Sequence, residues 1–197
     1  MSRVSREQAE LNRIAIEDAS SRLFKEKGIA GVSVADLMAS VGLTHGGFYG
    51  HFQSKDELAA IACAKAFDQS TARWKKRVED HPDRAAALAS IIDNYLSIES
   101  RNSVGTGCPL SALAIDVARE SEDKPVHDAF LTGVNNLLEI MVGLQGTGSD
   151  AHDRMRALGL ISTMVGGLVL ARATRGDNIS DEFLVAAREQ LISVASA

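Results

Sequence analysis

Cysteine is scarce in this chain of 197 residues: only Cys63 and Cys108 occur, far apart and without a C-x-x-C pair. This usage excludes a disulfide framework and a cysteine-rich metal site, and it is typical of a reducing cytosol. The five histidines are scattered without metal-ligand spacing. The sequence also lacks the G-x-S-x-G, H-E-x-x-H, P-loop and dinucleotide-binding signatures. We therefore expect no enzymatic activity, no metal and no cofactor.

Long hydrophobic runs are missing as well. No apolar segment follows Arg3 and Arg6, so the sequence predicts no signal peptide. The longest nearly apolar run, from Ala157 to Ala171, has 15 residues and contains Ser and Thr. A membrane-spanning helix needs about 20 such residues. We expect a soluble cytoplasmic protein without a membrane segment.

The chain also lacks the positive net charge that is typical of nucleic-acid-binding proteins, because its net charge is −5. Residues 1–55 contain seven Lys or Arg and six Asp or Glu, so this part carries +1 and the remainder −6. The acidic excess therefore belongs to the C-terminal part. The N-terminal part is only weakly basic, and strong electrostatic steering towards DNA is not expected.

What the sequence does contain is helical periodicity from end to end, without any strand pattern, which predicts an all-α fold. Serines at positions 54 and 180 are expected to cap helices, and three prolines mark helix starts or junctions. The pattern predicts a three-helix unit over residues 1–54 and a helical bundle over residues 55–197. Outside the motif described next, helices are expected over Ala9–Lys27, Lys55–Asp80, Asp83–Ser100, Pro109–Glu120, Pro125–Gln145, Asp150–Arg175 and Ser180–Ser196.

The segment from Ser33 to Phe52, SVADLMASVGLTHGGFYGHF, predicts two short helices joined by a tight turn. Ser33 is a good N-cap residue for the first helix, and Thr44 can cap the second. Gly42 lies between them, where a sharp turn favours a positive φ. This arrangement is typical of a helix-turn-helix motif.

The second of these helices is unusual because Gly46, Gly47 and Gly50 each cost a helix about 1 kcal/mol relative to alanine. On an α-helix, Phe48 and Phe52 share one face and the three glycines fall on the opposite one. We expect the phenylalanines to pack into a core. The bare glycine face would then allow another surface, such as the major groove of DNA, to approach the backbone closely.

The motif resembles the TetR (tetracycline-repressor) family of bacterial transcription regulators. The resemblance rests on the pattern formed by Thr44, Gly46, Tyr49, His51, Phe52, Lys55 and Leu58. It covers about the first third of the chain strongly and the rest only in helical layout. Met38 and Val41 depart from it, because the family usually has alanines there.

The resemblance implies a sequence-specific DNA-binding regulator with an N-terminal helix-turn-helix domain, residues 1–54, and a C-terminal bundle for ligand binding and dimerisation, residues 55–197. It implies a homodimer on a palindromic operator, and a repressor that is released by an unidentified small-molecule effector. The residues assigned to DNA are Ser33, Thr44, His45, Gly46, Gly47, Tyr49, His51 and Lys55. The candidate effector-lining residues, each of which also fits an ordinary core position, are Trp74, Tyr95, Cys108, Leu113, Phe130, Met141 and Met164.

Several alternatives stay open from the sequence. Cys108 precedes a predicted helix, where a thiol can have a lowered pKa and react with oxidants or electrophiles, or it can be a small packing residue. Residues 1–8 form an arm that reaches a minor groove or a frayed terminus. The basic residues around Trp74 fit a solvated face. The chain as a whole could also be a protein-docking module or a small helical enzyme or carrier, although neither explains the clustered glycines.

Overall fold

The computed structural model describes residues 5–146 and 148–195, and within them every regular element is a helix. The elements are α1 (Arg6–Lys27), α2 (Val34–Ser40), the 3-10 helix η1 (His45–Gly50), α3 (Lys55–Glu79), α4 (Arg84–Tyr95), α5 (Ile98–Asn102), the 3-10 helix η2 (Val104–Thr106), α6 (Pro109–Val117), α7 (Pro125–Gly143), α8 (Asp150–Ala173) and α9 (Ile179–Ala195). The all-α prediction is confirmed.

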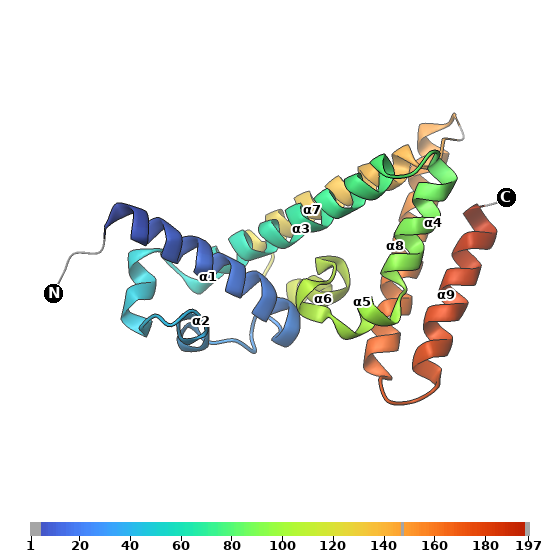
Figure 1. Cartoon of the computed structure of the whole chain (residues 1–197). Coiled ribbons are helices and arrows are strands. Elements are labelled where there is room, and N and C mark those ends of the chain that lie inside the picture. The colour runs from blue at the N-terminus through green and yellow to red at the C-terminus, as the bar shows by residue number, and fades with distance from the viewer. Residues whose placement is uncertain (1–4, 147, 196–197) are drawn as a thin grey trace.

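The helices form an elongated molecule with α1, α2 and η1 at one end and α8 and α9 at the other (Figure 1). The long helix α3 connects the two ends and lies beside α7, which runs in the same direction. An ion pair between Lys124 and Asp56 (3.1 Å) joins the N-terminal turns of these two helices. Further along, Gly133 of α7 faces Phe67 of α3, and a Cβ at Gly133 would lie 2.1 Å from the Phe67 ring. The missing side chain therefore permits the close approach of α3 and α7.

The N-terminal unit has an aromatic core. Phe24, Leu37, Phe48 and Phe52 are all buried, which confirms the core position predicted for Phe48 and Phe52. Arg13 of α1 fixes this core to the end of the motif, because its guanidinium lies 4.7 Å from the centre of the Phe52 ring. The apolar periodicity of α1 is less informative towards its start, where the side chain of Leu11 is exposed.

Several predicted helix boundaries are wrong for identifiable reasons. Helix α1 begins at Arg6 because Ser5 caps it, its Oγ accepting from the amide of Gln8 (3.1 Å), so Arg6 is not part of a free arm; Arg3 lies outside the described residues. The predicted helix Asp83–Ser100 is divided into α4 and α5, because Ser97 caps a new helix. Ser180 is not an N-cap: it lies inside α9 and its hydroxyl donates to the carbonyl oxygen of Ala171 (2.6 Å).

Helix α8 begins at the predicted Asp150 and ends two residues before the predicted Arg175, so it extends beyond the nearly apolar run Ala157–Ala171 on both sides. It has 24 residues, and its most apolar window of 18 residues has a mean hydropathy of 1.3, which is enough by length and composition to cross a membrane. A helix in the interior of a globular protein meets the same criteria, and α8 packs against α7 and α9. Only 39% of that window is buried in the isolated chain, and the large apolar side chains of Leu158 and Leu170 are among those exposed on α8.

Candidate functional site

The first helix of the motif is held by a capping box. The amide of Asp36 donates to the Ser33 hydroxyl (3.1 Å), and the Ser33 amide donates to the Asp36 carboxylate (3.0 Å). Hydrogen bonds from Ser33 also keep the pKa of Asp36 below its ordinary value. After α2 the chain turns at Gly42, which has a φ of 72°, in the left-handed region where a side chain would be strained. The helix-turn-helix prediction is correct up to this turn.

The second helix of the motif is a 3-10 helix of six residues, η1, instead of the predicted α-helix. Its backbone bonds span three residues, as in the bond from the Gly47 amide to the Thr44 carbonyl (3.0 Å). Thr44 occupies the N-cap position, but its side chain makes no capping hydrogen bond, so the predicted Thr44 cap is wrong. Three glycines among six residues supply too little helix propensity for a regular α-helix.

The two faces of η1 differ as the glycine pattern predicted, with one exception. Phe48 is buried, and a Cβ at Gly46 or Gly50 would meet nothing within 4 Å. Gly47 is the exception: a Cβ there would touch the terminal methyl of Met38 at 3.4 Å, so Gly47 faces α2. On the open side Tyr49 projects outward with 67% of its surface exposed.

The other residues assigned to DNA are exposed or half-buried. Ser33, Thr44 and His45 are exposed, and the rings of His45 and Tyr49 meet edge to face with centroids 6.4 Å apart. His51 is half-buried, and its carbonyl oxygen accepts a hydrogen bond from Arg13 (2.6 Å). Lys55 is half-buried in the first turn of α3, which Ser54 caps. Of this group, the structure brings His45 and Tyr49 into direct contact.

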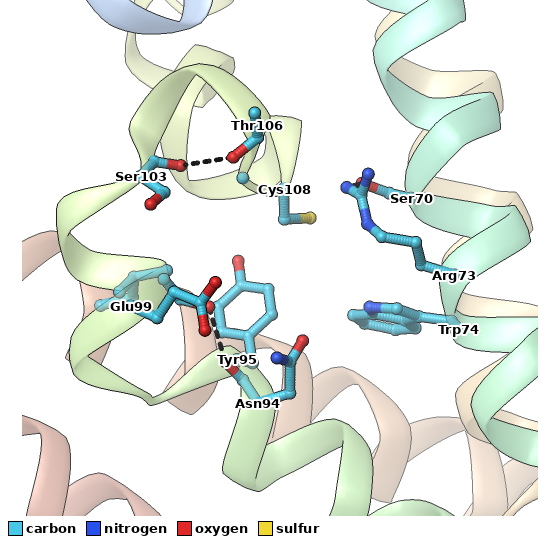
Figure 2. A pocket seen from close by; sticks show the side chains of 12 residues that line it. Ser70, Arg73, Trp74, Asn94, Tyr95, Glu99, Ser103, Thr106 and Cys108 are labelled. Atoms are coloured by element: carbon cyan, nitrogen blue, oxygen red, sulfur yellow. Dashed lines mark hydrogen bonds between the residues drawn. The ribbon is translucent and has the colours of Figure 1, made fainter.

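A second candidate site is a cavity of about 230 Å³ in the C-terminal part, shown in Figure 2. One wall belongs to α3 and carries Ser70, Arg73 and Trp74. The other wall comes from the end of α4 and from the segment that follows it, with Asn94, Tyr95, Glu99, Ser103, Thr106 and Cys108. The indole of Trp74 and the ring of Tyr95 meet edge to face, with centroids 6.3 Å apart. We call this space the Trp74 cavity.

The structure divides the predicted effector residues into two groups. Trp74, Tyr95 and Cys108 line the Trp74 cavity, and Leu168 joins them. The other four belong to the core or pack against it and do not line this cavity: Leu113, Phe130, Met141 and Met164. Phe130 contacts the ring of Phe67 edge to face. For these four residues the structure supports the packing interpretation.

Of the two alternatives for Cys108, the structure favours the packing residue over a thiol with a lowered pKa. The thiol lies directly before α6, but it is buried, and this burial raises its pKa above the ordinary value. The hydroxyls of Tyr95 and Ser70 and the charge of Arg73 act in the opposite direction without reversing the shift. Burial likewise raises the pKa of Cys63 to about 12. Neither thiol has the thiolate character of a reactive cysteine.

The wall of the Trp74 cavity also contacts the N-terminal unit. The ammonium of Lys25, near the end of α1, donates to the carbonyl oxygen of Gly107 (3.4 Å), and Gly107 lines the cavity. Nearby, the Asp116 carboxylate of α6 accepts from the backbone amide of Ile29 (3.0 Å). The end of α1 and the loop after it are therefore attached to the segment that forms the cavity.

Comparison with known proteins identifies the fold and the motif. The family model described as bacterial regulatory proteins, tetR family, matches residues 16–61, which include the motif and its neighbouring helices. A transcriptional regulator of the TetR family from Cytophaga hutchinsonii has the same fold: its structure superposes with a TM-score of 0.82 at 19% identity, covering 99% of this chain and 97% of that one. The chain belongs to the TetR family.

Sequence relatives of this TetR-family chain extend over most of its length. An uncharacterized HTH-type transcriptional regulator from Lactococcus lactis subsp. lactis is 26% identical over 170 residues, or 82% of this chain and 83% of the relative. The HTH-type transcriptional repressor DhaR of Mycobacterium sp. (strain GP1) is 22% identical over 188 residues, 89% of each chain. The TetR-family chain is a DNA-binding transcriptional regulator.

Sequence reasoning missed most of the polar wall of the Trp74 cavity. Arg73 was placed on a solvated face, and Asn94, Glu99 and Thr106 had no assigned role, although all line the cavity. They are ordinary polar residues on four different elements, so no spacing in the sequence connects them. Among the described residues, no three His, Cys, Asp or Glu side chains gather in a way that could hold a metal ion.

Proposed function

We propose that this TetR-family regulator is a homodimeric repressor that binds a palindromic operator and is released by a small molecule in the Trp74 cavity. The name of DhaR, a repressor, supports the sign of regulation. We further propose that residues 1–54 form the DNA-binding domain and residues 55–197 the domain for ligand binding and dimerisation.

The exposed face of η1 is the surface we assign to DNA. Gly46 and Gly50 leave the backbone open, so the major groove can approach closely, while Tyr49 and Lys55 beside it supply donors for phosphates. Ser33, Thr44, His45 and His51 complete this surface. Gly47 acts differently from our sequence assignment: its small size lets η1 lie against Met38.

Dimerisation is proposed through α8 and α9. Leu158 and Leu170 of α8 and Val185 of α9 are large apolar side chains that remain at least 40% exposed in the isolated chain. Gly159 and Gly166 of α8 are open as well, so a helix of a second copy can approach closely. Because η1 is short and can contact few bases, two copies across a two-fold axis are needed for a specific operator.

The contact between Lys25 and Gly107 is the observation that carries the proposal of effector release. A ligand in the cavity displaces the segment that contains Gly107, and this segment is bonded to α1 of the DNA-binding domain. A ligand that favours one position of α1 therefore changes the spacing of the two recognition elements in a dimer.

The test is a gel-shift titration with the DNA upstream of the chain's own gene at low salt. Tyr49→Phe should weaken binding about two- to tenfold on every bound sequence, the worth of one hydrogen bond to a phosphate. Lys55→Ala should lower the slope of log affinity against log salt by about one. Lys75→Ala, an exposed lysine later in α3, is the matched control and should change neither. Equal binding by all four proteins would overturn the assigned DNA surface.

A further inference from the structure

The Trp74 cavity is surrounded by more positive than negative charge. Arg73 is exposed at its mouth and belongs to its wall. Lys25 and Arg172 lie behind the opposite wall: Lys25 donates to the carbonyl of Gly107, and Arg172 donates to that of Ser100 (2.9 Å). The wall itself contains one carboxylate, that of the exposed residue Glu99. A ligand in the cavity thus lies against one cation, Arg73, and one carboxylate, and two further cations lie behind the wall.

These three cations have no ion-pair partner among the residues that the structure describes. The nearest acidic neighbour of Lys25 in the sequence, Glu26, pairs with Arg22 instead (3.2 Å). Burial and the charges of Arg73 and Arg172 lower the pKa of Lys25 to about 8. A buried ammonium without a carboxylate partner is costly, and an anion in the cavity would reduce that cost.

The floor of the cavity offers an unused hydrogen-bonding group. Tyr95 is only 4% exposed, and its hydroxyl points into the cavity towards Cys108, as Figure 2 shows. At regular hydrogen-bonding geometry this oxygen has no partner, although the Cys108 thiol and the Ser111 hydroxyl lie close enough to affect the pKa of Tyr95. Buried hydroxyls are almost always bonded, so this group is available to a bound ligand.

The size and the aromatic wall restrict what can bind. The volume of about 230 Å³ lies below the ~300–1,000 Å³ of typical ligand pockets, so a compact ligand fits better than a long acyl chain or a nucleotide. The indole of Trp74, 6% exposed, forms part of the wall and offers a flat apolar surface. Aromatic rings pack well on such surfaces.

We propose that the Trp74 cavity binds a compact aromatic carboxylate, with its carboxylate between Arg73 and the Tyr95 hydroxyl and its ring beside Trp74. This inference rests on the proposed function, because it names the chemical class of the effector. Arg73 has donors to spare for this role, since its guanidinium makes one hydrogen bond, to the Ser70 hydroxyl (2.9 Å).

Trp74 makes the inference directly measurable, because it is the single tryptophan of the chain. Titration of the DNA-free protein with benzoate should change its fluorescence, with a Kd in the millimolar range or tighter for so small a ligand. Benzamide, which has the same shape without the charge, should bind at least about tenfold more weakly. Equal affinities for benzoate and benzamide, or no saturable change with benzoate, overturn the proposal.

Three variants locate the anion. Arg73→Met should weaken benzoate binding about tenfold or more and benzamide binding much less, because a charge-assisted hydrogen bond is lost. Lys75→Met removes the same charge from an exposed position two residues away and is the matched control, with unchanged affinity expected. Glu99→Gln should strengthen benzoate binding about two- to fivefold by removing a repulsive charge. Equal effects of Arg73→Met and Lys75→Met would contradict a specific anion site.

A gel shift with benzoate separates this inference from the proposed function. Loss of operator binding at concentrations that saturate Trp74 supports both. Saturation of Trp74 with unchanged operator binding supports the anion site and overturns release by this ligand. No saturable change of Trp74 fluorescence with benzoate, together with loss of operator binding in an uncharged aromatic ligand, supports release and overturns the anion site.

Discussion

The Lys25 ammonium of α1 and the Gly107 carbonyl of the cavity wall are joined by a hydrogen bond although 82 residues separate them in the chain. The bond lies at the junction between the proposed DNA-binding and ligand-binding domains. Next to it, a Cβ at Gly105 would lie 2.2 Å from the Glu26 carboxylate, so α1 and η2 are in close contact. A change in the cavity therefore reaches α1 through a short and specific path.

Replacement of Lys25 by Met should weaken the coupling between the two sites. We expect the variant to bind operator and benzoate but to show a smaller loss of operator affinity when benzoate saturates the cavity. Lys27→Met, which removes an exposed lysine from the same helix end, is the control and should behave like the wild type. The measurement is operator affinity with and without ligand, and full release in Lys25→Met would contradict the path through Gly107.

Lys25 should also leave a signature in the pH dependence of stability. Its pKa is about 8 in the folded chain against an ordinary 10.5, so between these values the unfolded state holds more protons. The contribution of Lys25 to the free energy of unfolding should therefore rise with pH from about 8, after being unfavourable below it. The buried thiols act in the opposite direction near and above pH 9, because their folded pKa values are raised.

Urea unfolding of the wild type and Lys25→Met at pH 7, 8 and 9 isolates this contribution. The difference in unfolding free energy between the two proteins should shift in favour of the wild type as the pH rises. A difference that is constant over this range would show that Lys25 keeps its ordinary pKa in the folded chain.

Neither cysteine should react readily in the folded protein. Burial raises the pKa of both thiols, so the thiolate that reacts with iodoacetamide is scarce at pH 8. We expect alkylation at least about tenfold slower than in the urea-unfolded chain, as followed by mass spectrometry. Rapid native modification of Cys108 alone would restore the interpretation of this residue as a sensor.

Gly133→Ala should destabilise the protein. The added methyl would lie 2.1 Å from the Phe67 ring, and relief of such overpacking costs about 1–3 kcal/mol. Gly143→Ala, at the end of the same helix and open to solvent, should be neutral or stabilising by up to about 1 kcal/mol. Denaturant midpoints of the two variants provide the comparison, and equal midpoints would contradict the tight contact of α3 with α7.

A large side chain on the open face of η1 should weaken operator binding. Gly46→Leu leaves the free protein folded, because a Cβ there meets nothing within 4 Å, but it fills the space assigned to the groove. We expect operator affinity to fall about tenfold or more. Gly143→Leu, remote from the motif, should bind normally. Unchanged affinity of Gly46→Leu, with an unchanged circular dichroism spectrum, would refute the bare-face hypothesis.

The proposed dimer depends on the exposed apolar residues of α8. Leu158→Glu places a charge in that surface and should shift the protein from dimer to monomer in analytical ultracentrifugation. Leu11→Glu changes a leucine of α1 that is also exposed and should leave the oligomeric state unaltered. A stable dimer in the Leu158→Glu variant would place the interface elsewhere.

Local signals made the N-terminal half of the fold predictable. Ser33 and Gly42 carry their structural roles in their side-chain chemistry, and Phe48 with Phe52 carry the core. The 3-10 geometry of η1 and the contact of Gly47 with Met38 could not be predicted, because they depend on packing against α2. Only part of the Trp74 cavity could be predicted from the sequence, for a similar reason. Its polar residues come together from separate elements and share no spacing in the sequence.

Helix α3 is one continuous helix that connects the Trp74 cavity with the residues assigned to DNA. Lys55 at its start lies beside the surface assigned to DNA, and Arg73, 18 residues later, lies at the mouth of the cavity. At 1.5 Å per residue the two are about 27 Å apart along the axis. A tilt of about 5° at the cavity end therefore moves the other end by about 2 Å. So small a rotation is enough to take a side chain out of hydrogen-bonding range of a phosphate.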